Sequence, residues 1–130
     1  IPLHRFAKHN DNLITELLNS DEIEKVVKST MVGGATLTKL LGTSAWYAPG
    51  SSIAYLVDSI LNDHKNIIPC SVYLDGEYDQ SDICIGVPCL IGKNGLEKVI
   101  QLDLNDDELT KFNESADAVR SMNSTLVDHT

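Results

Sequence analysis

The stretch ICIGVPCLIGKNGLEKVIQL (Ile83–Leu102) decides the expected fold, because it holds two strand-like runs and the turn between them. The runs Ile83–Ile91 and Leu96–Leu102 are rich in apolar residues, and Gly92-Lys93-Asn94-Gly95 separates them. An Asn-Gly pair tolerates the positive φ angles that tight hairpin turns require. The sequence therefore predicts an antiparallel hairpin.

A third strand-like run, Ile67–Leu74, precedes this hairpin, and a longer polar connection from Asp75 to Asp82 joins the two. Proline interrupts two of the three runs, at Pro69 and at Pro88. Since proline cannot donate a hydrogen bond to a neighbouring strand, we expect both prolines at edge positions or bulges.

A long helix is expected before the strands. Asn19 and Ser20 offer N-cap oxygens ahead of an acidic turn, and Gly42 suits the left-handed residue that follows a helix. Gly33 and Gly34 interrupt this pattern, and each costs roughly 1 kcal/mol relative to alanine in a helix. We expect a kink or a close approach by a neighbouring element to compensate for that cost.

Two further helices are predicted. Gly42–Ser52 is expected to be a loop that leads into the second helix, which carries an apolar stripe at helical spacing. The terminal helix should begin at Asn105 with Glu108 completing a capping box. The stripe of the second helix is Ile53, Leu56, Val57, Ile60 and Leu61, and that of the terminal helix is Leu109, Phe112, Ala116, Val119 and Leu126. The order of elements indicates an α+β fold.

Before the long helix the pattern is weaker. Ile1–Phe6 is compatible with the end of a strand, and Asn12–Leu18 with a short helix. With 130 residues the chain suits one compact domain, so we expect a single domain over 1–130.

The formal net charge of −9 argues against nucleic acid as a main partner, since phosphate binding needs a basic face. No apolar run approaches the length of a membrane-spanning helix, so we expect no membrane partner. An anionic substrate would need arginines to clamp it, and the arginines of this chain, Arg5 and Arg120, do not lie near any other candidate site residue in the sequence. Such a clamp is therefore expected outside this chain.

The chain contains no glycine-rich dinucleotide fingerprint, no P-loop and no spacing typical of a metal site. Cys70, Cys84 and Cys89 are expected to be small core residues in a reducing compartment, because their number is odd and they form no paired pattern. The histidines are expected to have structural roles, since none has a nearby sequence partner for acid–base or metal chemistry. They are His4, His9, His64 and His129.

The segment Thr43–Pro49 differs, because it places small residues beside the only tryptophan of the chain, Trp46. Small and aromatic residues together can line a pocket for an organic ligand. The alternative is that Trp46 and Tyr47 pack this loop onto the body of the domain, since aromatic side chains bury large areas in most settings.

The segments MVGGATLTKLLGTSAWYAPGSS (Met31–Ser52) and YLDGEYDQSDICIGVPCLIGKNGLEKVIQLDL (Tyr73–Leu104), with the terminal helix, resemble the C-terminal domain of lactate dehydrogenase-like malate dehydrogenases. The resemblance covers residues 23–127 and implies antiparallel strands packed with long helices. It also implies an oxidoreductase of the tricarboxylic acid cycle that interconverts malate and oxaloacetate with NAD, in a cytoplasmic homo-oligomer such as a dimer.

The same resemblance limits what this chain contributes. In the family the Rossmann NAD-binding domain, the substrate arginines and the acid–base histidine all precede the part that this chain resembles, so no catalytic residue is assigned to it. Ser44 and Ala45 match positions that border the substrate and the nicotinamide, and Pro49 matches a position near the cofactor ring. NAD would be bound mainly by the missing domain, and this chain alone is expected to be inactive.

Two alternatives remain open. The first is the C-terminal domain of a lactate or other 2-hydroxyacid dehydrogenase. The residues that choose between the two substrates lie mostly outside this sequence, but by the resemblance Ala45 in the SA-Trp-Tyr-Ala-Pro loop favours malate. The second is a stand-alone binding or oligomerisation domain. The choice between NAD and NADP is also open, because the residue that reads the ribose is not in this sequence.

Overall fold

The computed structural model describes residues 1–126 and divides into two compact units, Ile1–Gly50 and Ser51–Thr130. Each unit is described by itself, and the single domain expected over 1–130 stays a prediction. His129 lies outside the described residues. No helix within 1–126 is both long enough and apolar enough to span a bilayer.

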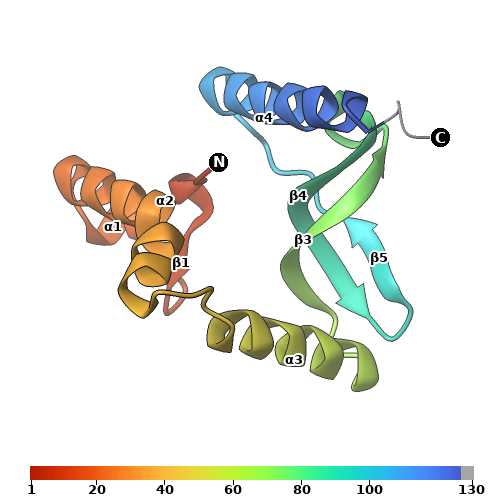
Figure 1. The fold of residues 1–130 in the computed structure, drawn as a ribbon, viewed down its shortest axis with the longest axis horizontal. Coiled ribbons are helices and arrows are strands. Elements are labelled where there is room, and N and C mark those ends of the chain that lie inside the picture. The colour runs from red at the N-terminus through yellow and green to blue at the C-terminus, as the bar shows by residue number, and fades with distance from the viewer. Residues whose placement is uncertain (127–130) are drawn as a thin grey trace. The chain divides into compact units, whose positions relative to one another are not determined.

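The first unit begins with four short elements and continues in a long helix (Figure 1). Asn10 and Asp11, with φ of 48° and 68°, form the turn of a small hairpin. The strand end expected over Ile1–Phe6 is wrong, because a 3-10 turn occupies His4–Phe6. The helix expected over Asn12–Leu18 forms only over Ile14–Leu17, because Asn12–Leu13 is a short strand. The elements are η1 (His4–Phe6), β1 (Lys8–His9), β2 (Asn12–Leu13), α1 (Ile14–Leu17) and α2 (Ser20–Leu41).

Helix α2 begins and ends where its sequence predicts. The Asn19 side chain accepts from the Glu22 amide at 3.1 Å, and the Glu22 carboxylate accepts from the Asn19 amide at 2.9 Å. Two N–H groups that the first turn leaves without helical partners are thereby satisfied. Gly42 ends the helix with φ of 69°, a conformation that suits glycine.

The compensation expected at Gly33 and Gly34 is not found within the described residues. Helix α2 runs without interruption through both positions, and apart from the adjacent residues and the helix's own nearby backbone no described atom lies within 4 Å of the place where a Cβ would stand on either glycine. The apolar residues around them are exposed, including Met31 and Leu40. The helix therefore bears the propensity cost of both glycines with no close contact in this part of the chain.

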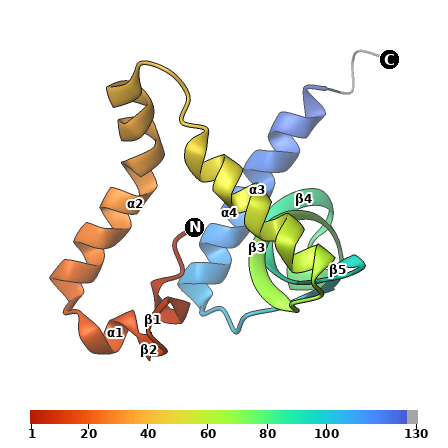
Figure 2. The ribbon, with the colours of Figure 1, turned by 90° about the horizontal axis from the view of Figure 1, so that it is seen from below.

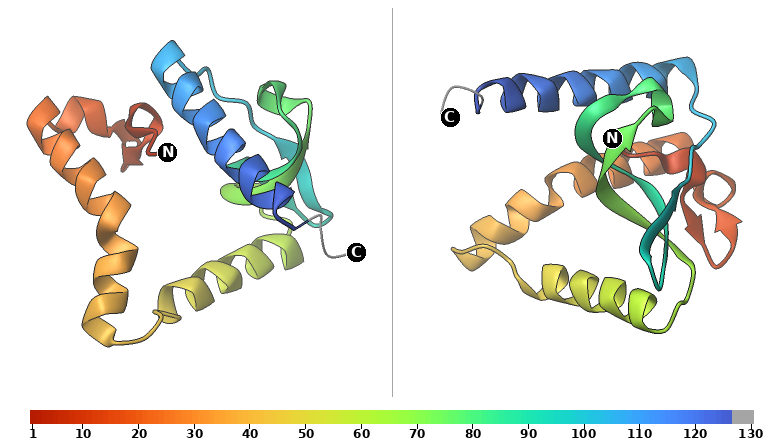
Figure 3. Two further views of the ribbon diagram at one scale, coloured as in Figure 1. Left: turned by 45° about the horizontal axis from the view of Figure 1, so that its top comes forward. Right: turned by 90° about the vertical axis from the view of Figure 1, so that its right-hand side faces the viewer.

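The second unit is a three-stranded antiparallel sheet in the order β3-β4-β5, with α4 at one end and α3 at the other (Figures 1 and 3). Figure 2 shows the sheet from below, with α3 passing in front of it. The predicted α+β class and the hairpin between Gly92 and Gly95 are both confirmed. The elements are α3 (Tyr47–Leu61), which starts before the division between the units, β3 (Asn66–Asp75), η2 (Glu77–Asp79), β4 (Ser81–Gly92), β5 (Gly95–Val99) and α4 (Asp106–Ser124).

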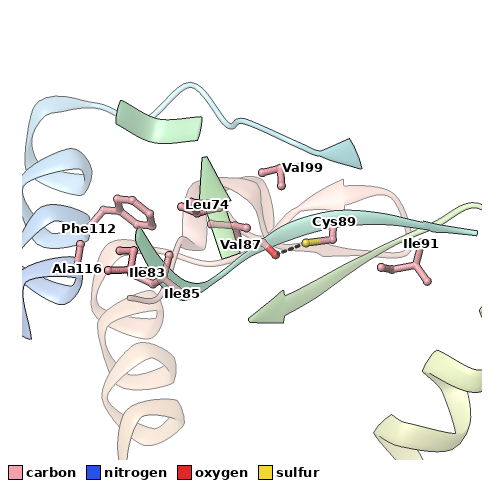
Figure 4. Close-up of a cluster of buried hydrophobic side chains, with 9 residues drawn as sticks. All are labelled: Leu74, Ile83, Ile85, Val87, Cys89, Ile91, Val99, Phe112 and Ala116. Atoms are coloured by element: carbon pink, nitrogen blue, oxygen red, sulfur yellow. Dashed lines mark hydrogen bonds between the residues drawn. The ribbon is translucent and has the colours of Figure 1, made fainter. Parts of the chain in front are cut away.

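The core lies along one face of the sheet, with α4 packed on it at one end and with Leu56 and Ile60 of α3 also packed against it (Figure 4). Strand β4 alternates buried and exposed residues along Ile83–Val87, as expected for a strand with one covered face. Phe112 and Ala116 of α4 lie beside Ile83 and Ile85 of β4. The buried apolar residues are Leu74, Ile83, Ile85, Val87, Cys89, Ile91, Val99, Phe112 and Ala116.

The two strand prolines are register partners, Pro69 on β3 and Pro88 on β4. Pro69 lies on an edge strand as expected, but Pro88 lies in the central strand, so that part of the expectation is wrong. The Pro88 carbonyl accepts from the Ile100 amide at 2.8 Å and so points away from β3. Because a residue's nitrogen and oxygen point to the same side of a strand, the nitrogen of Pro88 also points away from β3. Pro69 and Pro88 therefore face each other at a position where no backbone hydrogen bond joins the two strands, and the absence of an N–H from both prolines costs no bond between them.

The cysteine expectation holds for two of the three residues. Cys89 is fully buried, Cys70 is half-buried against the same core, and Cys84 is exposed. Cys84 is exposed because it lies one position away from Ile83 and Ile85 along β4, and neighbouring side chains of a strand point to opposite faces.

Candidate functional site

The candidate site is the connection from α2 to α3, and the structure makes it shorter than the sequence suggests. Gly42 turns the chain out of α2, and α3 already begins at Tyr47, where a loop was expected through Ser52. The Gly50 amide donates to the Trp46 carbonyl at 2.8 Å, which closes the first turn of α3. Ser44 and Ala45 thus lie in the loop, whereas Pro49 belongs to the helix.

Pro49 explains why the loop was predicted to be longer. A proline reads as a helix breaker in the interior of a helix, where its nitrogen cannot donate and its ring clashes with the preceding turn. In the first turn the N–H groups have no helical acceptor, so a proline there costs no hydrogen bond. Pro49 occupies that first turn and fixes the backbone direction just after the loop.

The small residues of the loop differ in exposure. Ser44 is exposed, and its hydroxyl makes no hydrogen bond to another residue within 1–126. Ala45 is half-buried. A hydroxyl that has no protein partner can donate to a ligand oxygen, and a methyl side chain leaves space for a bulky group beside it.

The aromatic residues of the loop do not pack it onto its surroundings in this chain. Trp46 is 59% exposed and Tyr47 is 85% exposed. The alternative in which both rings bury the loop against the body of the domain is therefore wrong for the described residues. The interpretation of this segment as part of the wall of a ligand pocket stays a prediction.

The chemistry available in this segment is limited. Apart from the Tyr47 phenol, Gly42–Gly50 contains no ionisable side chain. Acid–base catalysis requires a titrating group within hydrogen-bond reach of the proton that moves. The segment can therefore orient a ligand through Ser44 and through its shape, and proton transfer would need a group from elsewhere.

His64 has an acidic partner that sequence reasoning missed. His64 Nε2 lies 3.1 Å from Asp58 Oδ2, six residues earlier, and the other Asp58 oxygen accepts from Asn62 at 2.7 Å. The expectation that no histidine has a partner is wrong for His64, because a turn after α3 folds it back onto the helix. The pair lies at the C-terminal end of α3, away from the loop.

Both arginines contact other side chains of the described residues. Arg5 lies over the Phe6 ring, with its Cζ 4.8 Å from the ring centroid. Arg120 donates to Gln80 Oε1 at 2.7 Å and to Asp117 Oδ1 at 3.2 Å, and this joins α4 to the start of β4. Gln80 is buried, and its amide nitrogen also donates to Asn113. Both arginines thus have structural partners.

Within residues 1–126 no group of three or more histidine, cysteine, aspartate or glutamate side chains is placed to hold a metal ion. The thiol of Cys89 is a poor nucleophile, because burial raises its pKa. Neither result points to a catalytic group outside the Gly42–Gly50 segment.

Comparison with known proteins places the chain in a family. Residues 1–128 match the family model described as the lactate/malate dehydrogenase α/β C-terminal domain. A malate dehydrogenase of Flavobacterium johnsoniae is 62% identical over 97% of this chain and 40% of its own length.

Two solved structures share the fold closely. The malate dehydrogenase from Salinibacter ruber has a TM-score of 0.92 at 40% identity, covering 97% of this chain and 41% of that one. A lactate dehydrogenase from Eimeria maxima with NADH and oxamate has a TM-score of 0.91 at 36% identity, covering 97% and 41%. The chain thus spans about 40% of the length of the relatives that it matches.

Proposed function

The chain belongs to the lactate/malate dehydrogenase family, as its α/β C-terminal domain, and we propose that the protein it represents is an NAD-dependent malate dehydrogenase. In that reaction the carbon bearing the malate hydroxyl gives a hydride to NAD⁺, and the hydroxyl gives its proton to a base. The products are oxaloacetate, NADH and a proton. The observation that carries this proposal is the 62% identity to a malate dehydrogenase across nearly the whole chain.

We assign this chain a positioning role on the substrate side. Ser44 would donate a hydrogen bond to a substrate carboxylate, and Ala45 would leave the space that this carboxylate needs. Pro49 would border the cofactor ring with an apolar surface. Their support is the exposed Ser44 hydroxyl, the small Ala45 side chain and the rigid first turn of α3. Orientation of this kind accelerates a reaction by holding the reacting atoms near each other.

The cofactor would be NAD, held mainly by a dinucleotide-binding domain that is absent from this chain. The helix N-termini support that division. The first turn of α2 carries Asp21 and Glu22, and that of α4 carries Asp106, Asp107 and Glu108. Carboxylates at these positions repel a pyrophosphate, which helix N-termini otherwise attract. The first turn of α3 carries no acidic residue, so this repulsion applies at α2 and α4. The small and apolar residues Ala45 and Pro49 fit a contact with the nicotinamide end of NAD.

The oligomeric state, the location in the cell and the partners are part of the same proposal. We also propose a homo-oligomer, such as a dimer, and a cytoplasmic location, both of which the family resemblance implies. The net charge of −9 supports a protein that does not use nucleic acid as its main partner. The substrate clamp would come from the missing domain, since Arg5 and Arg120 already have partners.

A lactate dehydrogenase is the second candidate, and one observation favours it: the Eimeria maxima lactate dehydrogenase matches this fold with a TM-score of 0.91, and malate dehydrogenases match it with scores from 0.87 to 0.92. The fold alone therefore cannot choose the substrate. The Ser44-Ala45 pair favours the dicarboxylate, because a small residue there leaves room for a second carboxylate. A stand-alone binding domain has no comparable support among the relatives.

The proposal is tested with the full-length protein that carries this chain. Malate and NAD⁺ are added, NADH is followed by its absorbance, and oxaloacetate is identified by mass spectrometry. We expect stoichiometric NADH and oxaloacetate from the full-length protein and neither product from residues 1–130 alone. A full-length protein that forms no NADH from malate would overturn the proposal.

A further inference from the structure

Cys70 on β3 and Cys89 on β4 lie beside each other in the core of the second unit. Cys70 is the register partner of Val87, and Cys89 is that of Ile68, so the two cysteines are diagonal neighbours on adjacent strands. Both side chains point to the core face of the sheet, since side chains alternate along a strand. Cys89 Sγ lies 4.0 Å from the Cys70 carbonyl oxygen. The structure therefore brings together two cysteines that are 19 positions apart in the sequence.

The two thiols differ in exposure. Cys89 is fully buried, and its S–H donates to the Val87 carbonyl at 3.3 Å (Figure 4). Cys70 is half-buried and lies on β3, an edge strand of the sheet. The pKa of Cys89 is raised, first by burial and then by the neighbouring Cys70. Because a protonated thiol reacts slowly, a reagent from solvent meets Cys70 first.

Cys84 offers a comparison, because it lies on the same strand as Cys89 and faces the other way. It is exposed on the outer face of β4, and its register partner is Tyr73. A bond between two strands needs both sulfur atoms on one face of the sheet. Cys84 is therefore open to reagents but has a tyrosine opposite it, whereas Cys89 is buried and has a cysteine beside it.

We propose that Cys70 and Cys89 form a redox modification site, at which hydrogen peroxide oxidises the two thiols to a reversible disulfide between β3 and β4. A partly exposed thiol beside a resolving cysteine is the arrangement that redox-sensing sites use. Disulfides of this kind also occur in reducing compartments, where they form transiently. The proposal does not rest on the proposed function, because neither cysteine belongs to the Ser44–Pro49 segment.

The oxidation takes place in two balanced steps. The Cys70 sulfur attacks one oxygen of hydrogen peroxide, so that an S–O bond forms and the O–O bond breaks. The released hydroxide takes the proton of the Cys70 thiol and leaves as water. The Cys89 sulfur then attacks the Cys70 sulfur, an S–S bond forms, the S–O bond breaks, and the hydroxide leaves with the Cys89 proton as a second water. Two thiols are oxidised by two electrons, and the peroxide is reduced to water.

Closing this bond needs a small movement of β3. Diagonal neighbours on adjacent strands lie about 7–8 Å apart, whereas the Cα atoms of a disulfide are about 5.5–6 Å apart. The two strands must therefore approach by about 1–2 Å at this point. As an edge strand of the described sheet, β3 pairs with β4 on one side, so it can shift toward β4 without breaking a second pairing. A disulfide closed under strain is reduced readily by small thiols, so the modification is reversible.

The test uses the full-length protein and needs no variant. The folded protein is treated with hydrogen peroxide at a dose that oxidises most of the exposed Cys84, the remaining thiols are blocked with iodoacetamide in denaturant, and the protein is digested without reduction. Cleavage after lysine leaves all three cysteines in residues 66–93. A second cleavage after Glu77 separates Cys70 from Cys84 and Cys89. Tandem mass spectrometry then identifies which cysteine is linked to Cys70.

We expect a Cys70–Cys89 link in at least about half of the molecules, and dithiothreitol should remove it. Recovery of Cys70 and Cys89 as blocked thiols would overturn the proposal. So would a link that runs through Cys84, or further oxidation of Cys70 without a link. Because the readout is a mass and not a rate, the result stands whether or not the full-length protein oxidises malate.

Three variants test the order of the two steps. Cys84→Ala is the matched control and should keep the yield of the link within about twofold of the wild type. Cys89→Ala should leave Cys70 as a sulfenic acid, which dimedone traps, and Cys70→Ala should leave Cys89 reduced. Equal oxidation of Cys89 in Cys70→Ala and in the wild type would contradict the paired site. If either core variant fails to fold, the wild type and Cys84→Ala decide the question.

Discussion

The ring of Tyr78 lies 5.0 Å from the ring of Phe112, centroid to centroid, with the planes tilted by 38°. The Tyr78 hydroxyl extends beyond this contact, donates to the Ile100 carbonyl at 2.8 Å and accepts from the Leu102 amide at 2.9 Å. One side chain thus joins η2, the core face of α4 and the connection between β5 and α4.

Replacing Tyr78 with phenylalanine should therefore destabilise the chain by about 1–3 kcal/mol, because two partly buried backbone groups lose their partner while the ring contact is kept. Urea denaturation followed by circular dichroism measures this. Tyr55→Phe on the exposed side of α3 is the control and should change the free energy of unfolding by less than about 0.5 kcal/mol. Equal effects in the two variants would show that the hydroxyl contributes nothing.

The same tyrosine predicts how stability depends on alkaline pH. The pKa of Tyr78 is raised above its ordinary value of 10.0, mainly because burial disfavours the charged phenolate. The folded protein therefore holds this proton more tightly than the unfolded chain does. Its contribution is fully present below pH 10.0 and is lost as the pH rises through the folded pKa.

Alkaline unfolding of Tyr78→Phe should accordingly be less steep with pH than that of the wild type above pH 10.0. Tyr73 also titrates in this range, since its hydrogen bond to Asp82 raises its pKa, so the difference between the two proteins is the quantity to measure. Identical pH profiles would contradict the assignment to Tyr78.

Gly34 offers a test of whether α2 meets a close neighbour outside the described residues. In the isolated chain Gly34→Ala should stabilise by about 1 kcal/mol, because alanine has the higher helix propensity and the space is open. In the full-length protein Gly34→Leu should destabilise if another element approaches the glycine, as the sequence led us to expect. An unchanged melting temperature for full-length Gly34→Leu would rule out such an approach.

The substrate role of the loop predicts that Ser44→Ala lowers kcat/KM for malate about tenfold or more in the full-length enzyme, since a hydrogen bond to a charged group contributes about 1.5–3 kcal/mol. Ser44→Thr, which keeps the hydroxyl, should retain most of the activity. Ser51→Ala, in the exposed second turn of α3, is the control and should behave as the wild type. A full loss in Ser44→Thr together with no loss in Ser44→Ala would point to a steric role.

Much of the fold could be predicted from local chemistry. Asn19 and Asn105 form the capping boxes that their sequences indicate, and Gly92–Gly95 closes the hairpin. These features succeed because each depends on residues within a few positions of one another. Pro88 and His64 were misjudged because their partners, Ile100 and Asp58, become visible only once the chain has folded.

The candidate site could not be predicted from local sequence chemistry either. Its residues, Ser44, Ala45 and Pro49, came from the family resemblance, and the structure adds their exposure and the early start of α3 at Tyr47. The contact between Lys65 and Glu97 could not be predicted, because the two residues are 32 positions apart in the sequence and meet only in the folded chain. The spacing of these two residues in the sequence gives no indication that they pair.

The substrate preference of the full-length enzyme tests the central claim most directly. The quantity to measure is kcat/KM for malate divided by kcat/KM for lactate, both with NAD⁺ in excess. A dicarboxylate site built beside Ser44 and Ala45 predicts a ratio of at least about 100, since one buried charged hydrogen-bonded contact contributes about 1.5–3 kcal/mol and its loss leaves a charge unpaired. A ratio below one would contradict the malate assignment and make the protein a lactate dehydrogenase.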